Sequence, residues 1–155
     1  MLSKQPMGLC ALTLVLATWN AALLAGDEDA LVKAAKESNR TFRLVSQVTD
    51  GEPRPEEEFK NLRMTLSDGK WTITRGDEFV SSGTFKVVAL KDGVRQVEGT
   101  VVKGEDAGRS SKHVSKQEGE KMTICRALEG KEFPGEFASK PGRGHVLSVW
   151  IREKP

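Results

Sequence analysis

The side chains that could carry chemistry are few in this chain and lie far apart. The chain has two histidines, His113 and His145, and two cysteines, Cys10 and Cys125. A zinc site needs three or four His, Cys or carboxylate ligands, and the two histidines lie in no such spacing. We therefore expect no bound metal and a solvated surface position for each histidine. Cys125 could act as a nucleophile beside a base, but it lies in a strand-like run, where we expect it to be an ordinary buried cysteine.

The other polar clusters have structural explanations. Glu56, Glu57 and Glu58 are consecutive, so they cannot all face one site, and they suit the start of a helix. No Gly-x-Ser-x-Gly nucleophile elbow is present. Residues 140–144 contain two glycines but lack the strand–loop–helix context of a phosphate-binding loop, and we expect Arg143 to decorate a turn. We assign no catalytic residue and no cofactor, and we expect no enzymatic activity.

Hydrophobic residues alternate with polar residues from Thr41 onward. Successive side chains of a strand point to opposite faces, so this alternation predicts strands with one buried and one solvated face. The alternating apolar sets are Phe42, Leu44 and Val48; Leu62, Met64 and Leu66; Trp71 and Ile73; Phe85, Val87 and Ala89; Val97 and Val101; Met122 and Ile124; and Leu147, Val149 and Ile151.

Turn signals separate these runs. Asp68-Gly69 and Asp92-Gly93 favour tight hairpin turns, because Gly adopts positive φ at little cost. Short strands joined by tight turns predict a mainly β fold with an antiparallel up-and-down meander. We expect the meander to close into a barrel, because closure removes exposed edges. A short helix after the first strand, beginning near Pro55, interrupts it, and Phe59 of this helix packs inward.

The N-terminal residues have the features of a secretory signal. Lys4 precedes an apolar stretch over residues 9–24, and Ala25 and Gly26 provide a small-residue exit before the polar chain. The stretch is short for a membrane span of about 20 residues and contains Asn20. We therefore expect a signal peptide over 1–25, a linker or short helix over 26–40 and one barrel domain over 41–155. The protein would be exported to a periplasmic or extracellular location, with no integral membrane span after signal removal.

Charge and cysteine content exclude several classes of partner and bond. The chain carries 24 basic and 22 acidic residues, a net charge of +2, which gives no case for nucleic acid or an anionic membrane as partner. Removal of the signal leaves Cys125 alone, so the exported chain has no internal disulfide. Its stability must come from packing, and its oligomeric state is not set by the sequence.

The interior of the expected barrel has two alternatives. Aromatic residues lie on the strand-like runs, and a barrel of about eight strands can either fill its interior or enclose one small ligand. If a cavity exists, we expect a small apolar or amphipathic molecule to bind there. The candidate binding residues are Phe42, Leu44, Leu62, Met64, Trp71, Phe85 and Met122.

From residue 50 to 152 the chain resembles a planctomycete uncharacterised-domain family of small exported, lipocalin-like proteins of unknown function. The matching pieces are DGEP at 50–53, PEEEF at 55–59, LRMTL at 62–66, KWTI at 70–73, SGTF at 82–85, MTIC at 122–125 and the stretch 134–147. The family usually has a tryptophan where this chain has Phe42, and an apolar strand where this chain has the polar run 113–117. The resemblance implies a lipocalin-like barrel, and it carries over no ligand and no activity.

Two functional hypotheses follow. The first is an exported, non-enzymatic barrel that binds a small apolar or amphipathic molecule. The second is a cell-envelope interaction or structural module with a packed barrel and no ligand, in which the polar strand 113–117 and the loop 103–112 form a working surface.

Overall fold

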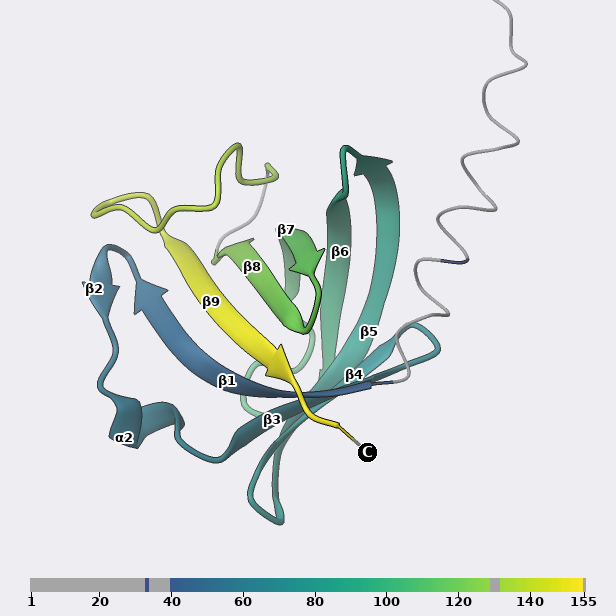
Figure 1. The fold of residues 1–155 in the computed structure, drawn as a ribbon, viewed down its shortest axis with the longest axis vertical. Coiled ribbons are helices and arrows are strands. Elements are labelled where there is room, and N and C mark those ends of the chain that lie inside the picture. Colours follow the sequence, from purple (N-terminus) through teal and green to yellow (C-terminus); the bar gives the residue numbers. More distant parts are fainter. Residues whose placement is uncertain (1–32, 34–39, 129–131, 155) are drawn as a thin grey trace, which may run out of the picture.

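The computed structural model describes residues 33, 40–128 and 132–154 (Figure 1). The expected signal peptide over 1–25 and nearly all of the expected linker or helix over 26–40 lie outside the described residues. Of the described residues, 64% lie in strands and 4% in helices, and eight antiparallel strands close into a barrel. The expected mainly β, lipocalin-like barrel is confirmed.

The strands follow one another around the barrel in chain order. Each strand is antiparallel to its neighbours, and β1 pairs with β9 to close the sheet. Figure 1 shows these two strands side by side, in blue and yellow. The short strand β2 pairs only with the end of β1, and α2 follows it. The elements are β1 (Arg40–Thr49), β2 (Glu52–Pro53), α2 (Glu56–Phe59), β3 (Leu62–Ser67), β4 (Lys70–Arg75), β5 (Glu78–Lys91), β6 (Val94–Lys103), β7 (Ser110–Glu118), β8 (Lys121–Ala127) and β9 (His145–Arg152).

The two strongest turn signals form the hairpins that they predict. Asp68 and Gly69 join β3 to β4 with φ values of 47° and 73°, and Asp92 and Gly93 join β5 to β6 with 52° and 77°. Positive φ at both central residues is the requirement of the type I′ turn, whose twist matches the twist of the flanking strands. The meander therefore continues through these turns without a crossover.

A hydrophobic cluster fills the base of the barrel, the end at which β1 begins and β9 ends. Phe42 is only 1% exposed, and the expected short helix α2 contributes Phe59, which is 5% exposed. The buried members of this base cluster are Phe42, Leu44, Phe59, Met64, Met122 and Trp150.

Three of the expected inward sets are wrong in whole or in part. On β5 the register shifts between Val87 and Ala89, so that Phe85 and Val87 point into the barrel but Ala89 does not. The pairing of β1 with β9 shifts register between Leu44 and Ser46, and this β-bulge turns Gln47 rather than Val48 toward the interior. In β9 the buried positions are Val146, Ser148 and Trp150, whereas the expected set of Leu147, Val149 and Ile151 faces outward and is half-buried.

The segment after β8 covers the outer face of β8 and explains the apolar outer positions there. Cys125 is fully buried on this outer face, and its Sγ donates a hydrogen bond to the carbonyl oxygen of Ala138 at 3.4 Å. Leu147 of β9 pairs with Cys125 beneath the same segment. Both faces of β8 and β9 are therefore partly covered, which removes the clear alternation of a strand with one wet face.

The same segment is fastened to the turn between β1 and β2. The Asp50 carboxylate accepts a hydrogen bond from the Gly144 N–H at 2.9 Å, and the Gly51 N–H donates to Ser139 Oγ at 3.0 Å. Backbone hydrogen bonds from Gly144 and Gly142 hold the pKa of Asp50 below its usual value. The last loop is thus tied to the first turn across the top of the barrel.

Candidate functional site

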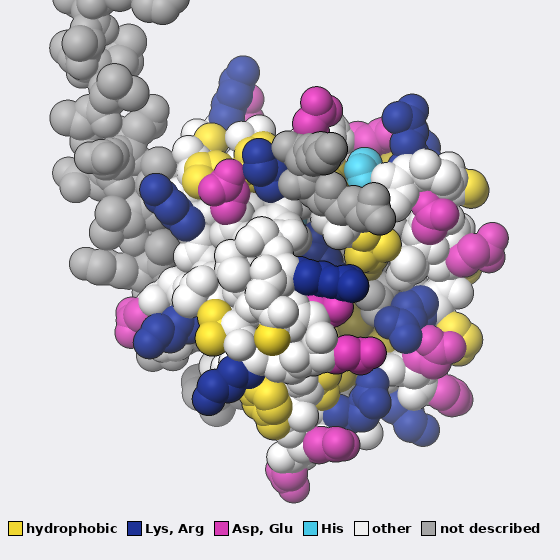
Figure 2. Space-filling model, turned by 180° about the vertical axis from the view of Figure 1, so that it is seen from behind, with side chains coloured by type: hydrophobic (Ala, Val, Ile, Leu, Met, Phe, Trp, Pro, Cys, Tyr) yellow, Lys and Arg dark blue, Asp and Glu magenta, His cyan; other side chains and the backbone are white. Residues whose placement is uncertain are grey.

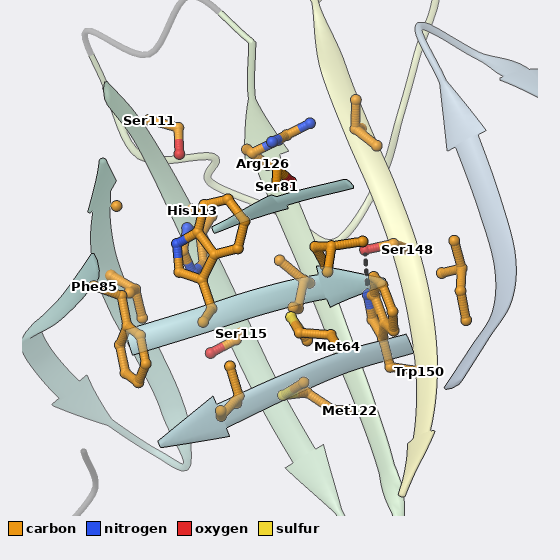
Figure 3. A pocket seen from close by; sticks show the side chains of 18 of the residues that line it. Met64, Ser81, Phe85, Ser111, His113, Ser115, Met122, Arg126, Ser148 and Trp150 are labelled. Carbon is orange, nitrogen blue, oxygen red and sulfur yellow. Dashed lines mark hydrogen bonds between the residues drawn. The ribbon is translucent and has the colours of Figure 1, made fainter. Parts of the chain in front are cut away.

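A cavity of about 440 Å³ occupies the barrel interior (Figure 3). It lies above the base cluster, several members of which also line it. Of the two alternatives for the interior, the structure has the cavity rather than the completely filled barrel. Its size falls within the range of about 300–1,000 Å³ that is typical of small-molecule sites.

The wall built by β1 and β3–β5 is mostly apolar, and Gln47, Arg75 and Ser81 are its polar members. Trp71 and Ile73 of β4 and Phe85 and Val87 of β5 are among its apolar members. Six of the seven candidate binding residues line the cavity: Leu44, Leu62, Met64, Trp71, Phe85 and Met122. Phe42 does not line it and lies in the base cluster.

The opposite wall, built by β6–β9, is polar at several inward positions, and we call these positions the polar wall. Its members are Arg95 of β6, Ser111, His113 and Ser115 of β7, Arg126 of β8 and Ser148 of β9. Ser148 accepts a hydrogen bond from the indole Nε1 of Trp150 at 2.9 Å, which orients this tryptophan at the base (Figure 3). The cavity lining is therefore mostly apolar, with several groups among the apolar ones that can form hydrogen bonds.

His113 is the most unusual group of the polar wall. Its Nδ1 is buried and has no hydrogen-bond partner among the described residues. Burial, together with a smaller contribution from repulsion by Arg126, lowers the pKa of His113 to about 4. The imidazole is therefore neutral at pH 7, and the expected solvated position is wrong because β7 turns this residue inward.

Arg126 lies directly opposite His113 in the pairing of β7 with β8. Its side chain borders the cavity and is exposed. Burial lowers the pKa of Arg126, and the Asp106 carboxylate acts in the opposite direction. Within residues 40–128 and 132–154, its guanidinium takes part in none of the side-chain hydrogen bonds or ion pairs.

The charged residues at the rim are occupied by local partners. Arg54 forms an ion pair with Glu58 at 2.7 Å and a hydrogen bond to Gln47 at 3.3 Å. Arg75 donates to the Glu58 carbonyl oxygen at 3.2 Å, and Asp106 pairs with Arg109 at 3.1 Å. Arg126 has no comparable contact within the described ranges.

Other reactive groups lie outside this site. Burial raises the pKa of the Cys125 thiol, and the thiol faces the outer segment rather than the cavity. His145 is half-buried, and its carbonyl oxygen accepts hydrogen bonds from Ser139 Oγ and the Asp50 N–H. In the described part of the chain, no three His, Cys, Asp or Glu side chains are grouped so that they could hold a metal ion.

The sequence analysis did not identify the polar wall, although the two-residue alternation of the strands predicts that its residues point inward. Arg95 has the same parity as Val97 and Val101, which were expected inside, and Arg126 has the same parity as Met122 and Ile124. The alternation predicts the inward direction of both arginines, but their charge favours assignment to the surface.

The outer surface mixes charges of both signs. Figure 2 shows Lys and Arg side chains interspersed with Asp and Glu on the face seen from behind. None of the helices in the described ranges has the length and hydropathy needed to cross a membrane. No protein-family model matches the chain, and neither a curated protein nor a solved structure matches it.

Proposed function

We propose that the protein is an exported, non-enzymatic barrel that binds one small amphipathic molecule in its interior. The observation that carries this proposal is the cavity of about 440 Å³ with a mostly apolar lining and several polar groups. Ligand sites are mostly apolar with a few placed polar groups, and this cavity has that composition. At about 30 Å³ for each water-sized group, it has room for on the order of 15 such groups.

The second hypothesis, a packed barrel that acts only through its surface, receives less support. A packed interior would leave no volume of this size, and buried His113 Nδ1 would be expected to have a partner. The proposal of export rests on the features of residues 1–25. The intact mass of the protein recovered from the cell envelope or medium tests it, because removal of the expected signal peptide lowers that mass.

Tryptophan fluorescence provides the binding assay, because Trp71 and Trp150 both line the cavity. We expect titration with medium-chain aliphatic compounds to change the emission saturably, with one ligand per barrel by native mass spectrometry. Absence of both signals across a panel of such compounds would overturn the proposal.

Gly99 offers a variant that closes the cavity and a matched control. It lines the cavity, and a Cβ placed there would meet its nearest neighbour, Ser111 Oγ, at an ordinary 3.5 Å. We expect Gly99→Phe to fill the interior and abolish binding, whereas Gly99→Ala retains it. Equal binding by both variants would place the ligand outside the barrel.

A further inference from the structure

Resting on the proposed function, we propose that the ligand is an amphipathic anion of the carboxylate class, whose charged group is held by Arg126 and His113 and whose chain lies toward Met64, Met122 and Trp150.

Arg126 and His113 lie toward a different end of the cavity from its largest apolar side chains at the base. Figure 3 shows Arg126 and His113 toward one end, with Ser81 and Ser111 near them, and Met64, Met122 and Trp150 toward the other. His113 and Arg126 are directly paired across β7 and β8, so both can reach one small charged group. A ligand with a polar head and an apolar chain matches this separation.

The described cavity lining has an excess of positive charge, because it contains Arg54, Arg75, Arg95 and Arg126. Arg54 forms an ion pair with the Glu58 carboxylate and Arg75 donates to the Glu58 backbone carbonyl oxygen, whereas Arg126 has no hydrogen bond or ion pair within the described ranges. Among the described cavity-lining residues, Asp106 is the only carboxylate, and it is paired with Arg109 on the loop before β7. A cationic head would meet repulsion here, whereas an anionic head would add to the partial compensation that Asp106 gives Arg126.

The hydrogen-bonding groups suit an oxyanion. The guanidinium of Arg presents its donors in a planar fork that binds a carboxylate through two parallel hydrogen bonds. His113 Nδ1 is buried without a partner among the described residues, and a neutral imidazole can donate from this nitrogen in the appropriate tautomer. A carboxylate placed between the two side chains satisfies both.

Three probes that share a chain and differ in charge test the inference: dodecanoate, dodecanol and dodecyltrimethylammonium, each below its micelle concentration. Hydrogen bonds to charged groups favour dodecanoate over dodecanol by roughly tenfold to a hundredfold in Kd. We expect the ammonium compound to bind weakest, because it meets Arg126. Equal affinities for dodecanoate and dodecanol would overturn the inference while leaving the proposed function standing.

Variants locate the effect. We expect Arg126→Met to weaken dodecanoate to the affinity of dodecanol and to leave dodecanol unchanged, and Arg126→Lys to give an intermediate loss, because an ammonium lacks the planar fork. Arg43→Met, on the exposed face of β1, is the matched control and should change neither affinity. An unchanged preference for dodecanoate in Arg126→Met would refute the assigned site.

The remaining outcomes are also decisive. If no probe binds, both the proposed function and the inference fail. If the probes bind with equal affinity, only the inference fails. If Arg126→Met does not fold, the comparison of the three head groups on the unaltered protein still decides the charge preference. The Arg126→Lys variant then tests the location.

Discussion

Gly83 is the residue at which one added carbon atom should cost the most. A Cβ at this position would lie 2.1 Å from the backbone oxygen of Thr100 and 2.6 Å from the Trp71 ring, whereas ordinary contact begins at 3.4 Å. Gly83 is buried within β5, between β4 and β6, so neither neighbouring strand can move away freely. The Gly83→Ala variant must therefore displace the indole of Trp71 and separate β5 from β6 locally.

The expected cost follows from these two displacements. Overpacking of a filled site costs about 1–3 kcal/mol, and each strand-pairing hydrogen bond weakened by the separation adds about 1 kcal/mol. We expect Gly83→Ala to lower the free energy of unfolding by about 3 kcal/mol. For a domain of this size such a loss lowers Tm by roughly 10 °C.

Gly99 on the adjacent strand is the matched control. Its added Cβ would meet only ordinary contacts, and replacement of Gly by Ala restricts the unfolded chain, so we expect Gly99→Ala to be neutral or slightly stabilising. Urea unfolding followed by tryptophan fluorescence gives both values, with the slope of the transition unchanged. Equal stability of Gly83→Ala and Gly99→Ala would refute the reasoning.

Two further predictions concern His113 and Cys125. Because the pKa of His113 falls from 6.5 in the unfolded chain to about 4 in the fold, the unfolded state binds more protons between these values. The free energy of unfolding should therefore fall by about 3 kcal/mol as the pH drops from 6.5 to 4. Urea titrations at each pH should show that the His113→Gln variant lacks this part of the loss. The same dependence of the unfolding free energy on pH in both proteins would contradict the lowered pKa of His113. Cys125 is fully buried and its thiol pKa is raised, so a thiol reagent should modify it only in denaturant, and rapid modification of the native protein would contradict its placement.

The alternation of inward and outward side chains along each strand predicts much of the barrel, and it fails at particular residues. The sets Leu62, Met64 and Leu66 on β3 and Trp71 and Ile73 on β4 line the cavity as expected, because a solvated outer face keeps their alternation clear. On β1 a single extra residue at the bulge reverses the parity, so Gln47 replaces Val48. No local sequence signal marks this bulge, because it arises from the pairing of β1 with a strand about 100 positions away.

The polar wall could not be assigned from composition for a different reason. Histidine and arginine are mostly exposed in proteins, so the base rate opposes the strand period at His113 and Arg126. On β9 the outer positions are apolar because the segment after β8 covers that side of the barrel, and only the tertiary structure reveals this cover. The sequence therefore predicts the fold and most of the apolar lining, but not the groups that distinguish the cavity chemically.

The pairing of β1 with β9 has a consequence for the order of folding. These strands join the first and last parts of the described barrel, so the sheet cannot close until β9 has been synthesised. Until then β1 and β8 are exposed edges, which could pair with other chains. Contacts of such long sequence separation form slowly. We therefore expect this chain to remain open for most of its synthesis and to depend on chaperones or dilution at that stage, whereas the finished barrel presents no edge between β1 and β9.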